Sequence, residues 1–133
     1  MKRGMPERGT VLAFDFGLKR IGVAVGEAEM KSAHPLATVQ SFSEIEAIIR
    51  EWRPARLVVG LPVAEQGAHP LAKRVERFAR QLEGRYRVPV ALVDERFTSV
   101  EAEARLRGMK KKAVDSVAAQ LILEQYFREH GAA

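Results

Sequence analysis

The chain has 133 residues, of which 47% are hydrophobic and 29% are charged, and its formal net charge is +5. This size and composition predict a flexible tail over residues 1–9 and one globular domain over residues 10–130. The absence of cysteine excludes disulfides, thiolate metal sites and thiol nucleophiles. No apolar run reaches the ~20 residues of a membrane span, so we expect no membrane association, and the polar start does not resemble a secretory signal.

The basic charge balance, with a sequence pI near 9.9, favours a polyanionic partner. Nucleic acid is the commonest partner of that kind. The alternative is that a basic surface only keeps the protein soluble, and the charge alone does not choose between the two.

Apolar patterning predicts three strands near the start of the chain. A buried strand over Thr10–Asp15 is followed, after a short turn, by a second over Arg20–Gly26, so we expect an antiparallel hairpin. Glycine and alanine alternate on one face of the second strand, which lets another element pack closely there. A weaker third strand is expected over Pro35–Val39.

Helices and strands alternate through the rest of the chain. The first helix begins after Ser41, which has capping-box spacing to Glu44, and ends before Pro54. The order of elements predicts an α/β fold with a mixed five-stranded sheet, an antiparallel meander followed by parallel strands, flanked by helices. The later elements are a strand at Leu57–Val59, a helix over Leu71–Leu82 with Gly84 near its end, a strand over Val88–Val93, a short helix over Thr98–Leu106 and a last helix over Ala113–Glu129.

Acidic residues stand at the ends of apolar elements in three places. Asp15 ends the first strand, Asp94 and Glu95 end the last strand, and Asp115 lies at the start of the final helix. Sites in open α/β sheets gather at the carboxyl ends of parallel strands, so Asp15 and Glu95 meet if their strands are parallel neighbours. Successive strand residues point in opposite directions, and of the adjacent pair we favour Glu95. Clustered carboxylates repel one another, and Mg²⁺ or Mn²⁺ would offset that repulsion.

Each of these acids also has an ordinary structural interpretation. Asp15 fits a turn residue, and Asp115 fits a cap on the last helix. A transition-metal site is disfavoured, because the histidines lack ligand spacing: His34, His69 and His130.

Cations lie close in sequence to the acids. Acids that hold metal, with cations nearby that hold phosphate, are typical of a nuclease. The alternative for the lysine run is a solvated loop. The predicted nucleic-acid-binding residues are Lys19, Arg20, Arg96, Lys110, Lys111 and Lys112.

Four segments resemble, in this order, the motifs of the YqgF/RuvX family: DFGLKRIGVAVGE, VVGLPV, DERFTSVEAEARL and KKKAVDSVAAQLIL. The resemblance covers Val11 to Phe127. It implies an RNase H-like nuclease domain with a two-metal site in which Asp15, Glu95 and Asp115 are the metal ligands and catalytic acids. Members of this family are described as pre-16S rRNA nucleases or as Holliday-junction-resolvase-like proteins.

The function expected from the resemblance is hydrolysis of RNA phosphodiesters at the 5′ end of pre-16S rRNA, in the cytoplasm and without a small-molecule cofactor. The substrate would be the RNA or a precursor ribosomal particle. One alternative is a resolvase of branched DNA, which requires a dimer. Another is a non-catalytic RNA-binding factor in ribosome assembly. An ATP-binding protein of the actin-like superfamily needs two such domains, and this chain is too short for them.

Overall fold

The computed structural model describes residues 8–64, 66–95 and 106–130. The order of elements agrees with the predicted pattern, and the predicted short helix over Thr98–Leu106 lies outside the described residues except for Leu106. The elements are β1 (Thr10–Phe16), β2 (Ile21–Glu27), β3 (His34–Val39), α1 (Phe42–Trp52), β4 (Arg56–Leu61), α2 (Ala72–Tyr86), β5 (Val90–Asp94) and α4 (Lys111–His130).

The five strands form one mixed sheet in the order β3-β2-β1-β4-β5. β1 and β3 are antiparallel to β2, whereas β4 is parallel to both β1 and β5, so the predicted α/β architecture is confirmed. The first and last strands are not neighbours, however. The chain returns through α1 to place β4 on the free edge of β1, and β5 can then pair only with β4.

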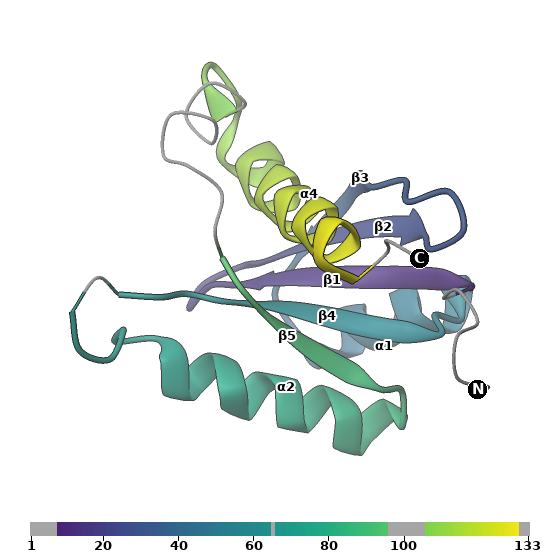
Figure 1. Cartoon of the computed structure of the whole chain (residues 1–133), viewed down its shortest axis with the longest axis horizontal. Coiled ribbons are helices and arrows are strands. Elements are labelled where there is room, and N and C mark those ends of the chain that lie inside the picture. The colour runs from purple at the N-terminus through teal and green to yellow at the C-terminus, as the bar shows by residue number, and fades with distance from the viewer. Residues whose placement is uncertain (1–7, 65, 96–105, 131–133) are drawn as a thin grey trace.

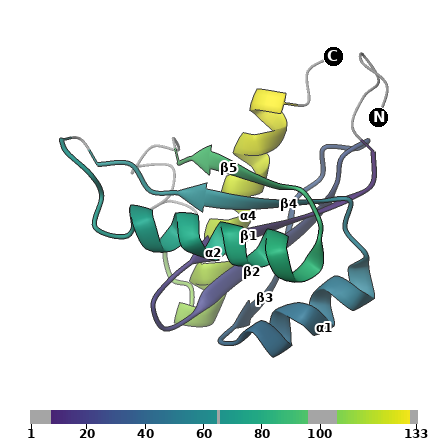
Figure 2. The same cartoon turned by 90° about the horizontal axis from the view of Figure 1, so that it is seen from below.

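Helices cover both faces of the sheet (Figures 1 and 2). Among the described residues, α1 and α2 lie on one face and α4 lies on the other. The core under α1 and α2 contains Phe14, Ile45 and Phe78, and the core under α4 contains Val58 and Tyr126. The side chains of each strand alternate between these two cores, which assigns every strand residue to one face.

Capping explains where α1 begins and where α2 ends. Ser41 Oγ accepts a hydrogen bond from the Glu44 amide at 3.3 Å, as the predicted cap requires. Gly84 lies near the end of α2, as predicted, and the helix continues to Tyr86, with Arg87 as its C-cap in the left-handed conformation. Tyr86 packs against the core and donates a hydrogen bond to the Phe42 carbonyl at 3.1 Å, which holds this last turn in place.

The last helix, α4, begins at Lys111, earlier than predicted. Asp115 therefore lies in the second turn of the helix, and its interpretation as an N-cap is wrong. None of the helices in the described part of the chain has the length and hydropathy needed to cross a membrane.

Candidate active site

Asp15 and Glu95 share the face of the sheet that α4 covers. Val11 and Ala13 of β1 and Val93 of β5 pack in the core under α4, and side chains two residues further along point the same way. The Glu95 amide donates to the Leu61 carbonyl at 3.1 Å, which extends the β4–β5 pairing beyond Asp94. The carboxyl ends of β1 and β5 thus present both acids on one side, although another strand lies between them.

Gly60 of β4 makes room between these two acids. β4 lies between β1 and β5, and the register pairs Val59 with Phe14 and Gly60 with Val93. A Cβ added to Gly60 would lie 2.9 Å from Glu95 Oε1 and 2.4 Å from Ile122 Cδ1. A larger residue on β4 would therefore occupy the space beside Glu95.

Asp115 reaches the same region because α4 packs closely on β2. Gly22 of β2 is the register partner of Asp15. A Cβ on Gly22 would lie 1.8 Å from the carbonyl oxygen of Asp115, so the helix backbone rests directly on this strand. The close packing predicted from the small residues of this strand is confirmed, and it sets the position of the third acid.

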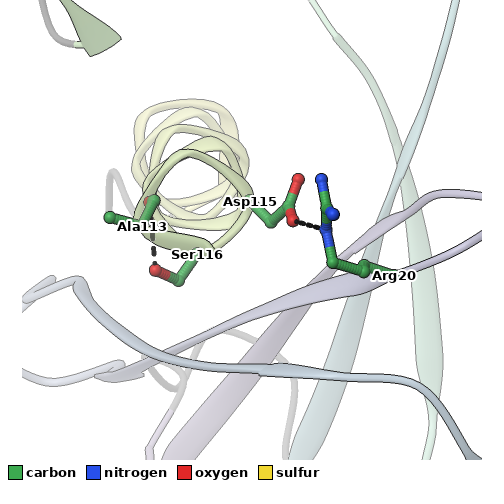
Figure 3. Close-up of polar contacts among 4 residues, drawn as sticks. All are labelled: Arg20, Ala113, Asp115 and Ser116. Carbon is green, nitrogen blue, oxygen red and sulfur yellow. Dashed lines mark hydrogen bonds and ion pairs between the residues drawn. The ribbon is translucent and has the colours of Figure 1, made fainter. Parts of the chain in front are cut away.

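Arg20 binds Asp115 in the structure. Arg20 Nε donates to Asp115 Oδ2 at 2.7 Å, and the two side chains are 33% and 22% exposed (Figure 3). In the same turn of α4, Ser116 Oγ donates to the Ala113 carbonyl at 3.2 Å. A cation predicted to bind phosphate is thus the partner of a predicted metal ligand.

The electrostatics of the site centre on Asp15. Burial, together with the nearby carboxylates of Glu95 and Asp115, raises the pKa of Asp15 to about 7. Burial also raises the pKa of Glu95 above its ordinary value, and His69 acts in the opposite direction. These shifts indicate that Asp15 lies within electrostatic reach of both Glu95 and Asp115, in a buried place where its ionised form is disfavoured.

The acids lie near one another, but in the described residues they are not arranged as a complete metal-binding site. Within residues 8–64, 66–95 and 106–130, no group of three or more histidine, aspartate or glutamate side chains is arranged to hold a metal ion. Asp115 is turned toward Arg20 instead. The donor set nevertheless fits a hard divalent cation, which takes oxygen ligands and would offset the burial and the repulsion that together raise the pKa of Asp15.

The other predicted nucleic-acid-binding residues make no contact with the acids that the described residues show. Lys19 and Lys110 are exposed, and Arg96 lies outside the described residues. Lys111 and Lys112 form the first turn of α4 rather than a loop. The nucleic-acid-binding role of these cations stays a prediction.

Asp94 is the last residue of β5, and its carbonyl accepts a hydrogen bond from the side-chain amide of Gln125. Strand alternation directs its side chain away from the α4 face, which bears Glu95. Glu95, rather than Asp94, is thus on the same face of the sheet as Asp15, and its role in the site stays a prediction.

Sequence reasoning missed His69. This residue follows β4, its Nδ1 accepts a hydrogen bond from the Leu71 amide at 3.0 Å, and it influences the pKa of Glu95. Its position in a loop after the carboxyl end of a parallel strand was the available signal, because such loops border the site in open α/β sheets. Ligand spacing, the criterion applied to the histidines, cannot detect a residue of this kind.

Comparison with solved structures defines the class of fold. The structure of RuvC from Thermus thermophilus matches with a TM-score of 0.59, covering 92% of this chain and 98% of that one, at 16% sequence identity. The chain therefore has the RNase H-like fold of RuvC-type resolvases, as predicted.

Sequence comparison defines the family. The family described as RuvX: Holliday junction resolvase matches residues 9–129. A relative from Nitrosomonas europaea is 49% identical over 132 residues, covering 90% of this chain and 89% of the relative. A second from Methylobacillus flagellatus is 50% identical over 141 residues, covering 92% and 97%. Both are named as candidate pre-16S rRNA nucleases. This chain belongs to the RuvX family, which confirms the resemblance drawn from its motifs.

Proposed function

We propose that this protein is a metal-dependent nuclease that hydrolyses RNA phosphodiesters and processes the 5′ end of pre-16S rRNA in the bacterial cytoplasm. The observation that carries the proposal is the half-buried Asp15, whose pKa is raised to about 7 beside Glu95 and Asp115. Such surroundings disfavour the ionised form of an aspartate that has only a structural role. Neighbouring carboxylates are, in contrast, the ligands that a hard divalent cation takes. The names of the curated relatives favour pre-16S rRNA, free or in a precursor particle, as the substrate.

Asp15, Glu95 and Asp115 are the residues that would hold Mg²⁺ or Mn²⁺. When bound, such ions supply an activated water and stabilise the leaving oxygen of a phosphodiester. Gly60 keeps the space beside Glu95 open, and Gly22 lets α4 bring Asp115 to the sheet. In this scheme the fold positions oxygen ligands from a strand end on each side of β4 and from the last helix.

Substrate binding is assigned to the cations near the acids. Arginine and lysine side chains neutralise backbone phosphates, so binding and cleavage fall as salt rises. Arg20 has a second role, because its contact with Asp115 orients that carboxylate before substrate arrives. The proposed phosphate-binding residues are Lys19, Arg20, Arg96, Lys110, Lys111 and Lys112.

The experiment that tests the proposal is cleavage of an end-labelled RNA that carries a 16S precursor 5′ junction, free and in a precursor particle. Wild type, Asp15→Asn and Asp94→Asn are compared with Mg²⁺, with Mn²⁺ and with EDTA. We expect metal-dependent cleavage that Asp15→Asn abolishes and that Asp94→Asn, the matched control, retains. Cleavage that persists in EDTA or in Asp15→Asn would reject the proposed site.

A resolvase of branched DNA is the second candidate, favoured by the description of the family and by the likeness to RuvC. A four-way DNA junction in the same assay tests it, and preferential cutting of the junction would replace RNA by DNA as the substrate. If the RNA and its precursor particle are bound and neither they nor the junction is cut, the protein is a non-catalytic RNA-binding factor.

A further inference from the structure

The solvent side of α2 carries a row of cations that the carboxylate site does not use. Lys73, Arg77 and Arg80 stand at positions i, i+4 and i+7 of the helix, which places them on one face. Arg87, at the C-cap, continues the row, and all four side chains are exposed. These four residues, named here the α2 ridge, span about 21 Å at the ~1.5 Å rise of an α-helix.

The ridge points away from the sheet. The opposite side of α2 buries Val75, Phe78, Ala79 and Leu82 in the core. Apolar residues on one side of the helix and cations on the other fix the rotation of α2 about its axis. The ridge is therefore held in place by the core rather than by polar contacts of its own.

Charge is divided unevenly between the two helices on this face of the sheet. α2 has five cations and two acids, whereas α1 has one cation and three acids. Within the described part of the chain, the ridge cations form no ion pair, whereas Arg50 of α1 pairs with Glu46. Glu76 and Glu83 line a shallow hollow toward β5 with Arg80, and so lie on the flank of the ridge. The positive charges of the ridge are thus available to bind an external anion.

The ridge begins at the end of the sheet where the acids lie. α2 follows the carboxyl end of β4 through one loop, so its first residues are at that end, and it then runs back along the sheet (Figure 1). α2 is on the face of the sheet opposite α4, however. A nucleic-acid segment on the ridge is consequently a different segment from the one at Asp15 and Asp115.

We propose that the α2 ridge binds the phosphate backbone of a second helical arm of the substrate RNA while the scissile segment lies at the carboxylates. This inference rests on the proposed function and adds to it a preference for RNA with more than one arm. Three of the four ridge residues are arginines, whose forked guanidinium groups bind phosphate oxygens in pairs.

The test measures the salt dependence of RNA binding by fluorescence anisotropy. The double variant Arg77→Gln/Arg80→Gln is compared with wild type and with Arg50→Gln/Arg53→Gln, which removes the same charge from the α1 side. The probes are a labelled two-arm RNA, the same RNA cut to one arm, and a two-arm DNA of equal sequence. All are titrated in EDTA, so that cleavage does not interfere.

For the two-arm RNA, we expect the ridge variant to lower the slope of log affinity against log salt by about 1.5, since each phosphate that is no longer neutralised lowers the slope by roughly 0.7 to 0.9. Affinity at low salt should fall about tenfold or more. The control double variant and the one-arm RNA should change little, and an equal effect on the two-arm DNA would extend the preference to helical arms of both kinds. The proposal would be overturned by an equal fall in affinity for the ridge and control variants. It would also be overturned if the ridge variant bound the two-arm RNA with unchanged affinity and salt slope.

A cleavage assay separates this proposal from the proposed nuclease function. The ridge double variant should raise KM for the two-arm RNA and leave kcat on the one-arm RNA unchanged. Asp15→Asn should abolish cleavage and leave the salt slope intact. If Asp15→Asn still cleaves the RNA, the proposed nuclease site is wrong. The salt dependence of binding still tests the α2 ridge in that case.

Discussion

Arg20 and Asp115 are 95 positions apart in the chain, and their side chains meet at 2.7 Å between Nε and Oδ2. This contact ties the turn of the β1–β2 hairpin to the second turn of α4. It also places a positive charge on a carboxylate that lies close to Asp15. In the absence of metal, the guanidinium group of Arg20 therefore offsets part of the negative charge of the acids.

Replacing Arg20 by glutamine should destabilise the metal-free protein by about 1 kcal/mol, the upper range for a partly exposed ion pair. The matched control is Arg50→Gln, which breaks the more exposed pair with Glu46 at 3.1 Å and should cost less. Urea denaturation of both variants in EDTA measures the difference. Equal costs would show that the contact with Asp115 has no special role in stability.

Replacing Asp15 by asparagine should stabilise the metal-free protein at pH 8 and not at pH 4. Folding raises the pKa of Asp15 from 3.8 to about 7, so between these values the folded state holds a proton that the unfolded chain has lost. The free energy of unfolding of the wild type therefore falls as pH rises from about 4 to 7. Above that range the charged carboxylate costs at most roughly 4 kcal/mol, and asparagine avoids this cost.

Thermal denaturation of wild type and Asp15→Asn in EDTA at pH 4, 6 and 8 measures this effect. The difference in Tm should grow with pH. A difference that stays constant across the series would show that Asp15 does not titrate between these values.

Adding Mg²⁺ or Mn²⁺ should raise the Tm of the wild type, because an ion that binds only the folded state stabilises it by mass action. At an ion concentration 100 times its Kd, the gain is about 2.7 kcal/mol. The gain should disappear in Asp15→Asn and persist in Asp94→Asn. A shift of equal size in all three proteins would mean that the ions bind elsewhere.

Replacing Gly22 by alanine should cost about 3 kcal/mol, the upper range for inserting a methyl group into a packed interior. The added Cβ would meet the backbone carbonyl of Asp115 at 1.8 Å, and backbone cannot rotate away as a side chain can. Gly84→Ala is the control, because a Cβ there meets nothing within 4 Å and should stabilise the exposed helix by about 0.5 to 1 kcal/mol. Urea denaturation curves that place both variants on the same side of wild type would contradict this description of α4 packing.

Much of the fold could be predicted because the apolar periodicity of each segment records which face it buries. The hairpin of β1 and β2, the cap at Ser41 and the small residues under α4 all follow from local patterns. The residues of a strand do not specify which strands lie beside it in the sheet, and so β4 was not expected between β1 and β5. The helix α2 continues past Gly84 because packing of Tyr86 on the core outweighs the local cost of one glycine.

The three acids could be chosen from sequence because each stands where an apolar element ends or begins. The residues that surround these acids could not be predicted from the sequence. The contact of Arg20 with Asp115 depends on how closely α4 approaches β2, which is set by Gly22. His69 and Gly60 contribute through their distance from Glu95, and that distance exists only once β4 and β5 are paired.

The position of α4 has a consequence for the order of events during protein synthesis. β1, with Asp15, is made well before α4, with Asp115, which closes over β1, β2 and β4. A growing chain that has not yet reached α4 leaves this apolar face of the sheet open to solvent and lacks the third acid. The carboxylate centre is therefore assembled only when translation of the domain is almost finished, so a partly synthesised chain does not carry a complete site.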